Sequence, residues 1–218
     1  MPLDYQLLLL AHLLLFVYWL GGDLGVFYSS FVVVDPKRSV EARATAAKIL
    51  IALDQVPRMC LVLILPVGIT LAMRLGLIDA QYKLLVWGVC GVWLAMVIAL
   101  HFNHAPWLAR LDTTLRSAVA IAALVGAWLA VTGDAVTPAR WVAAKLAVFG
   151  LIVGCGLAIR RVFAPFGPAF GALVRDGSSP EVEAVISGSL ARSRPFVVAI
   201  WVLLITAAWL GLTKPALA

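Results

Sequence analysis

Residues 5–34 read YQLLLLAHLLLFVYWLGGDLGVFYSSFVVV, an almost continuous apolar run in which His12 and Asp23 are the ionisable side chains inside the stretch. About 20 consecutive apolar residues are enough to cross the hydrocarbon core of a bilayer as a helix. The apolar residues do not alternate with polar ones, as they would in the strand of a membrane barrel. The stretch therefore predicts a membrane-spanning helix.

Five further segments of the chain have this length and character. They run from about residues 48 to 78, 82 to 103, 115 to 131, 137 to 163 and 193 to 212. The longest connection, 164–190, contains a turn and then a short helix that we expect to begin at Pro180. We predict an all-α fold, in which residues 1–218 form a single polytopic membrane domain of about six transmembrane helices.

The composition supports this reading. Hydrophobic residues make up 63% of the 218 residues and charged residues 13%, with a mean hydropathy of +1.03. Soluble domains are about half apolar and about one quarter charged, so most of this surface must face lipid or other helices. The net charge of +6 does not indicate nucleic acid as a partner, because no basic cluster is interleaved with aromatic residues.

The basic residues predict the orientation. Of the 17 lysine and arginine residues, eleven fall in one set of predicted loops and four in the other, and Arg58 and Lys145 lie inside spans. The eleven are Lys37, Arg38, Arg43, Lys48, Arg110, Arg116, Arg160, Arg161, Arg175, Arg192 and Arg194. The positive-inside rule places this set in the cytoplasm and both termini on the non-cytoplasmic side. A bacterial inner membrane is the expected location.

Ionisable groups inside spans are the candidate functional residues, because burying them in lipid costs a few kcal/mol. His12 and Asp23 are eleven residues apart, which places them within about 20° on one helix face, together with Trp19. The rise between His12 and Asp23 is about 16 Å. The face therefore touches two layers, one near the outer surface and one near the cytoplasm.

The outer layer is predicted to contain His12 and Lys145. Lys145 lies about two turns into the fifth span from the outside, and Trp141 lies one turn above it, next to Arg140. Imidazole is the usual axial ligand of haem iron. We therefore take His12 as a candidate metal ligand and Lys145 as a candidate catalytic residue.

The inner layer is predicted to contain Asp23, Asp54, Arg58, His101 and His104. Asp54 and Arg58 are spaced i, i+4, so they can pair on one helix face, and all three charged residues are candidate catalytic groups. The two histidines close the third span and are candidate metal ligands. The alternative is structural: the charged pair satisfies itself, Asp23 makes an interhelical hydrogen bond, and the histidines reach the interface.

Four short patches resemble one protein superfamily. They are His12 to Gly22 with Trp19 between, Pro57-Arg58 to Gly68, Arg140-Trp141-Val-Ala-Ala-Lys145-Leu, and Ser193-Arg194-Pro195. In this order they resemble HemJ-type protoporphyrinogen oxidases and the related CopD copper-resistance membrane proteins. Those HemJ-type proteins have four spans, so the third and fourth spans here would be additional. Gly156 stands where their later helix has a histidine.

The HemJ-like resemblance implies a haem b held between helices, with His12 as its ligand or a close neighbour. Trp19 and Trp141 would stack on the porphyrin, and Lys145 and Arg140 would hold a propionate or an anionic substrate. The second axial ligand would be His101, His104 or a methionine. Since His12 and the other two histidines lie in different layers, two haems, or one haem and a separate inner site, are both open.

Three functions follow as hypotheses. The first is a haem-b protein that acts in electron transfer or as a membrane oxidoreductase. The second, implied by the CopD-like resemblance, is a transport or resistance protein for copper or another metal, with copper or iron bound by the inner Asp and His residues. The third is a non-catalytic subunit that binds other membrane subunits or a second copy of the chain.

Overall fold

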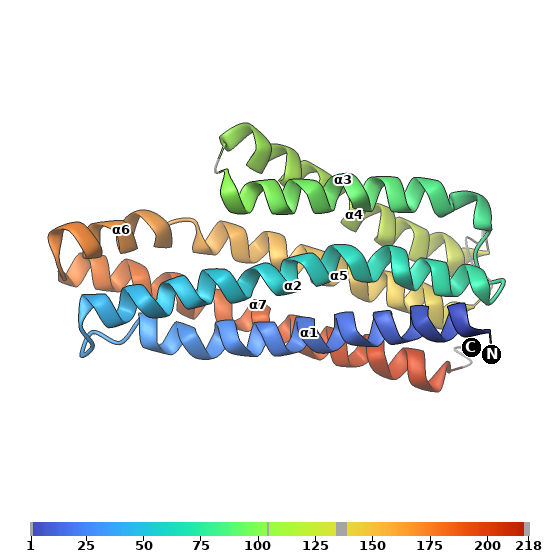
Figure 1. Cartoon of the computed structure of the whole chain (residues 1–218), viewed down its shortest axis with the longest axis horizontal. Helices are drawn as coiled ribbons and strands as arrows, with labels where there is room; N and C mark the ends of the chain where they lie inside the picture. Colours follow the sequence, from blue (N-terminus) through green and yellow to red (C-terminus); the bar gives the residue numbers. More distant parts are fainter. Residues whose placement is uncertain (1, 104, 134–138, 216–218) are drawn as a thin grey trace.

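The computed structural model describes residues 2–103, 105–133 and 139–215, and within these ranges the chain is helical and contains no strand (Figure 1). The elements are α1 (Leu3–Val33), α2 (Val40–Arg74), the short 3-10 helix η1 (Ala80–Tyr82), α3 (Lys83–Phe102), α4 (Pro106–Thr132), α5 (Arg140–Phe163), α6 (Phe166–Asp176) and α7 (Pro180–Thr213). In these ranges six helical stretches are long and apolar enough to cross a membrane, which confirms the predicted all-α polytopic bundle.

The bundle consists of antiparallel neighbours. α1 packs along α2, α5 packs along α7, and α4 lies on α5, while α3 contacts α2 (Figure 1). α1 begins and α7 ends at the same end of the bundle, as an even number of crossings requires (Figure 1). The central core combines side chains from six helices around Trp93 and Val62, both fully buried.

α1 and α2 approach closely because small residues face the contact. A Cβ atom placed on Gly22 would lie 2.8 Å from Cδ of Pro57, and one on Gly25 would lie 2.9 Å from Cδ1 of Leu53. Helices in lipid associate mainly through such close van der Waals packing, since lipid tails are as apolar as the side chains. The glycines of the first span therefore set the distance between α1 and α2.

Gly22→Ala is expected to lower the stability of the bundle by about 1–3 kcal/mol, because the Pro57 ring is rigid and cannot yield to the new methyl group. Gly21→Ala is the matched control, since nothing lies within 4 Å of a Cβ at Gly21. Thermal unfolding of the purified variants in detergent measures the difference. Equal midpoints for Gly21→Ala and Gly22→Ala would contradict this account of the helix contact.

The end of the bundle at which α1 ends and α7 begins has its own small core. Val33, Leu50, Leu173 and Ile186 are buried there and come from α1, α2, α6 and α7. Figure 1 shows these helices extending beyond the end of α3. The side chain of Gln55 donates a hydrogen bond of 3.4 Å to the carbonyl of Val97, which fixes the register of α3 against α2.

Arg43 connects three segments at this end of the bundle through hydrogen bonds. Its guanidinium donates two hydrogen bonds to the Glu183 carboxylate, at 2.7 and 2.8 Å, and a third to the carbonyl of Val33 at 2.8 Å. Ser178 also donates to Glu183. These contacts join the end of α1, the start of α2 and the start of α7.

Several predicted boundaries were wrong. The predicted connection 164–190 contains α6 and the first turns of α7, and the sixth span is part of one helix that runs from Pro180. The helix start at Pro180 was correct, because Ser179 caps it by accepting a 3.3 Å hydrogen bond from the Val182 N–H. The fourth helix begins at Pro106 rather than near residue 115. The predicted start at Thr137-Pro138 lies outside the described residues.

The predicted loop position of several basic residues was also wrong. Arg43, Arg116 and Arg160 lie within α2, α4 and α5, and the first two are buried. Each of the three has a carboxylate partner on a helix: Glu183 for Arg43, and Asp112 for the other two. This pairing allows Arg43 and Arg116 to be buried. Positive charge near a span end predicts the side of the membrane but not whether the residue is in a loop.

Candidate functional site

The interior face of α1 carries His12, Trp19 and Asp23, as the helical spacing predicts. Trp19 and Ser30 on this face are buried, whereas most large side chains elsewhere on α1 are exposed to the membrane. The His12 ring lies against α2, where a Cβ on Gly68 would be 3.0 Å from its Cε1 atom. Its Nδ1 atom is fully buried and has no hydrogen-bond partner among the residues that the structure describes.

Lys145 approaches the same region from α5. Its ammonium is close enough to His12 to act on it electrostatically. A Cβ on Gly211 of α7 would lie 3.0 Å from Nζ of Lys145, so the absence of a side chain at Gly211 makes room for the ammonium. Among the described residues Lys145 forms no ion pair. The structure thus brings His12 and Lys145 together, each seated against a glycine of a neighbouring helix.

The other predicted outer residues lie at the mouth of this region. Trp141 is half-buried and packs on a small cluster that includes Ala72 and Val142. The Lys214 ammonium lies 6.0 Å from the centre of the Trp141 ring. Arg140 begins α5 and is exposed. Trp19 lies farther down the bundle, so the structure does not pair it with Trp141.

The inner region is centred on Asp23. Its carboxyl faces the indoles of Trp19 and Trp201 and is electrostatically coupled to Asp54. The Trp201 Nε1 atom is fully buried and makes no hydrogen bond to a described residue. Asp54 pairs with Arg58 at the predicted i, i+4 spacing, and both side chains are partly exposed. Trp201 was not among the sequence-predicted residues, since its approach depends on the register of α7 against α1.

Of the two remaining histidines, the structure describes His101, which does not join this region. His101 is exposed at the end of α3, with its ring centre 5.0 Å from that of Phe102. His104 lies outside the described residues. In the described part of the chain no three His, Cys, Asp or Glu side chains gather closely enough to hold a metal ion.

A second charged cluster was missed by the sequence analysis. Asp112 is 0% exposed on α4, and its Oδ2 atom accepts hydrogen bonds from Arg116 Nε at 2.9 Å and Arg160 Nη2 at 2.5 Å. The Arg116 guanidinium also lies 5.3 Å from the centre of the Trp93 ring. The spacing of Asp112 and Arg116 is i, i+4, the signal that identified Asp54 and Arg58, so the sequence contained it.

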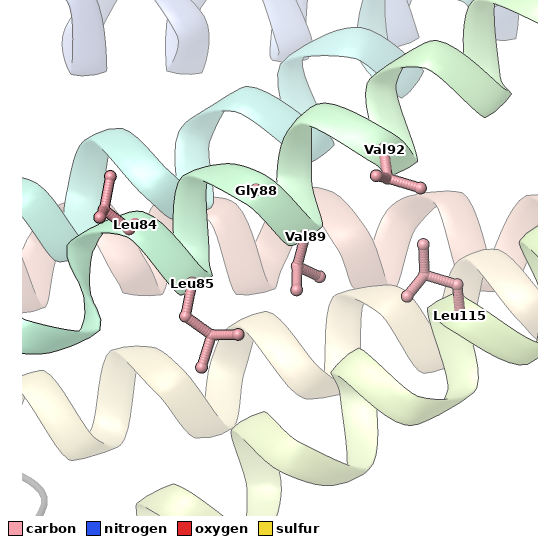
Figure 2. A pocket seen from close by; sticks show the side chains of 6 residues that line it. All are labelled: Leu84, Leu85, Gly88, Val89, Val92 and Leu115. Carbon is pink, nitrogen blue, oxygen red and sulfur yellow. The ribbon is translucent and has the colours of Figure 1, made fainter.

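An apolar hollow opens between α3 and α4 (Figure 2). Figure 2 shows its lining residues: Leu84, Leu85, Gly88, Val89, Val92 and Leu115. Ligand sites combine apolar walls with a few placed polar groups, and this lining has none. The hollow faces the membrane and is not the candidate functional site.

The arrangement around His12 and Lys145, from four helices, therefore offers a buried imidazole nitrogen and an ammonium that has no carboxylate partner in residues 2–103, 105–133 and 139–215. Comparison of the chain with protein-family models, with curated proteins and with solved structures finds no match.

Proposed function

We propose that this integral membrane protein binds haem b and transfers electrons, with His12 as an axial ligand of the iron. The observation that supports the proposal is that the His12 Nδ1 atom is fully buried and has no hydrogen-bond partner in the described part of the chain. Buried polar atoms in proteins nearly always have a hydrogen-bond partner. Coordination of a metal ion by the imidazole nitrogen would take the place of the missing hydrogen bond. Bound haem b would supply reversible one-electron chemistry.

Lys145 would neutralise a haem propionate in this proposal. An ammonium group buried in an apolar region is costly unless it meets an anion. Lys145 has no such partner among the described residues, and Gly211 leaves the ammonium room. Arg140 and Trp141 would complete the outer edge of the site.

Asp23 and Asp54 would take up the proton that accompanies reduction. Asp54 is partly exposed and Asp23 lies deeper, and the two carboxyl groups are electrostatically coupled. Chains of carboxyl groups within membrane bundles commonly carry protons. Arg58 would position Asp54 through their ion pair.

We propose that His12 is the one protein ligand of the iron among the described residues. His101 is at the far end of α3 and does not face His12, so a second ligand in the same layer is not a histidine of the described part. The resemblance to HemJ-type proteins at His12 and Lys145 supports the same assignment. Copper or iron transport through the inner Asp and His residues remains a prediction that no observation here favours.

The proposal is tested by reduced-minus-oxidised difference spectra of membranes that contain the overproduced chain. We expect the bands of a b-type haem in wild type. Gly68→Ala is expected to weaken and shift them, because the new Cβ would lie 3.0 Å from the His12 ring. Gly88→Ala is the control, since nothing lies within 4 Å of that position. The proposal would be contradicted if membranes that contain the overproduced wild-type chain showed no stronger b-type haem bands than membranes that lack it.

A further inference from the structure

The cluster around Asp112 contains more positive than negative charge. Arg116, 5% exposed, and Arg160 both bind the single Asp112 carboxylate, and neither pairs with another carboxylate in the described part of the chain. Arg116 Nη2 is fully buried and no described residue forms a hydrogen bond with it. Arg58 of α2 is also near enough to act on Arg116. Buried charge is stable only when it is matched, so this cluster favours a further anion nearby.

Arg160 is the member of this cluster that reaches the protein surface. Its side chain is 29% exposed, and Nη1 donates a 3.2 Å hydrogen bond to the Thr113 hydroxyl. Thr113 lines a shallow hollow together with Ala109, Arg110 and Thr114. Arg110 is exposed and forms no ion pair with a described residue. Two guanidinium groups therefore flank one surface hollow.

The hollow lies at the depth of the lipid headgroups. α4 begins at Pro106, and the neighbouring Phe102 and Trp107 are 82% and 65% exposed. Exposed aromatic side chains at span ends mark the membrane–water interface. The hollow is one to two turns along α4 from Trp107, at the end that the basic residues place in the cytoplasm.

We propose that Arg110 and Arg160 bind the phosphate of an anionic phospholipid from the cytoplasmic leaflet. Guanidinium groups match phosphate oxygens with paired N–H donors. The Thr113 and Thr114 hydroxyls donate to the carbonyls of Ala109 and Arg110, so the arginines must supply the donors. A zwitterionic lipid would bring a cation next to the arginines, which favours an anionic headgroup.

The test uses the full chain in a neutral detergent, with phosphatidylglycerol, phosphatidylcholine or inorganic phosphate added. Native mass spectrometry measures bound lipid, and thermal unfolding measures stabilisation. We expect binding and stabilisation by phosphatidylglycerol only. Arg110→Gln and Arg160→Gln should each weaken the apparent affinity by roughly fivefold, since a basic residue near an anionic surface contributes about 1 kcal/mol.

Arg161→Gln is the matched control, because Arg161 is adjacent, exposed and without an ion pair among the described residues. It should bind like wild type. Arg160 also contacts Asp112, so Arg110→Gln, at an exposed residue, keeps the test independent of folding. Equal binding of phosphatidylcholine, saturation by inorganic phosphate alone, or an unchanged affinity of Arg110→Gln would each overturn the proposal. So would a loss in Arg161→Gln equal to that in Arg160→Gln.

Discussion

His12→Ala is expected to reduce haem affinity by more than about 100-fold, because even residues that only support a metal ligand change affinity by 10–100-fold. His12 is the histidine whose ring lies between α1 and α2, and its Nδ1 atom has no other partner. Titration of the purified, haem-free variant with haemin, followed in the Soret region, measures the loss against wild type.

His101→Ala is the control for this experiment. His101 is exposed in the last turn of α3 and its ring contacts Phe102. Its replacement should leave the haemin titration unchanged. If His12→Ala bound haemin as tightly as His101→Ala, His12 would not be an axial ligand.

Asp112→Asn is expected to destabilise the protein by about 3–5 kcal/mol, the cost of removing one partner from a buried ion pair. The substitution leaves the Arg116 guanidinium, 5% exposed, without a counter-charge between α4 and α3. Thermal or denaturant unfolding in detergent measures the effect. Asp112→Leu combined with Arg116→Met should recover part of the loss, because the buried charge is then removed as well.

Asp35→Asn is the matched control for Asp112→Asn. Asp35 forms an ion pair with Arg38, but that pair lies on the surface, so its loss should cost less than about 1 kcal/mol. Equal destabilisation by Asp112→Asn and Asp35→Asn would show that the buried cluster does not stabilise the bundle.

Much of the fold could be predicted because the bilayer constrains it strongly. A run such as residues 5–34 has few alternatives to a spanning helix, since every backbone polar group must be paired within the segment. The same geometry placed His12, Trp19 and Asp23 on one face, and the structure has them there. Helical periodicity within one segment is a local property, so the sequence alone determines it.

The contacts between helices were much harder to predict. Lys145 was matched with His12 by depth, but the roles of Gly68 and Gly211 depend on rotation of α2 and α7 about their axes. Trp201 faces Asp23 for the same reason. The sequence does not distinguish a glycine that faces lipid from a glycine at a contact between helices. Only the packing of the helices shows which glycines lie at a contact.

Two further differences have a physical cause. α6 was predicted as part of a connection because Pro165, Gly167, Pro168 and Gly171 lie in or next to it, yet it folds as a helix because Leu173 is buried beside Ile186 of α7. Arg116 was counted as a loop charge because it stands near a span end. Its burial follows from Asp112 one turn before it and from Trp93 on α3, a combination of three positions that hydropathy alone does not weigh.

The haem content of the wild-type chain tests the central claim most directly. The chain would be purified from cells supplied with haem precursors, and haem and protein would be quantified in the same sample by the pyridine haemochrome method. The account predicts a haem b content close to stoichiometric with the protein. A folded, monodisperse preparation that contains no haem and takes up none from haemin would contradict it.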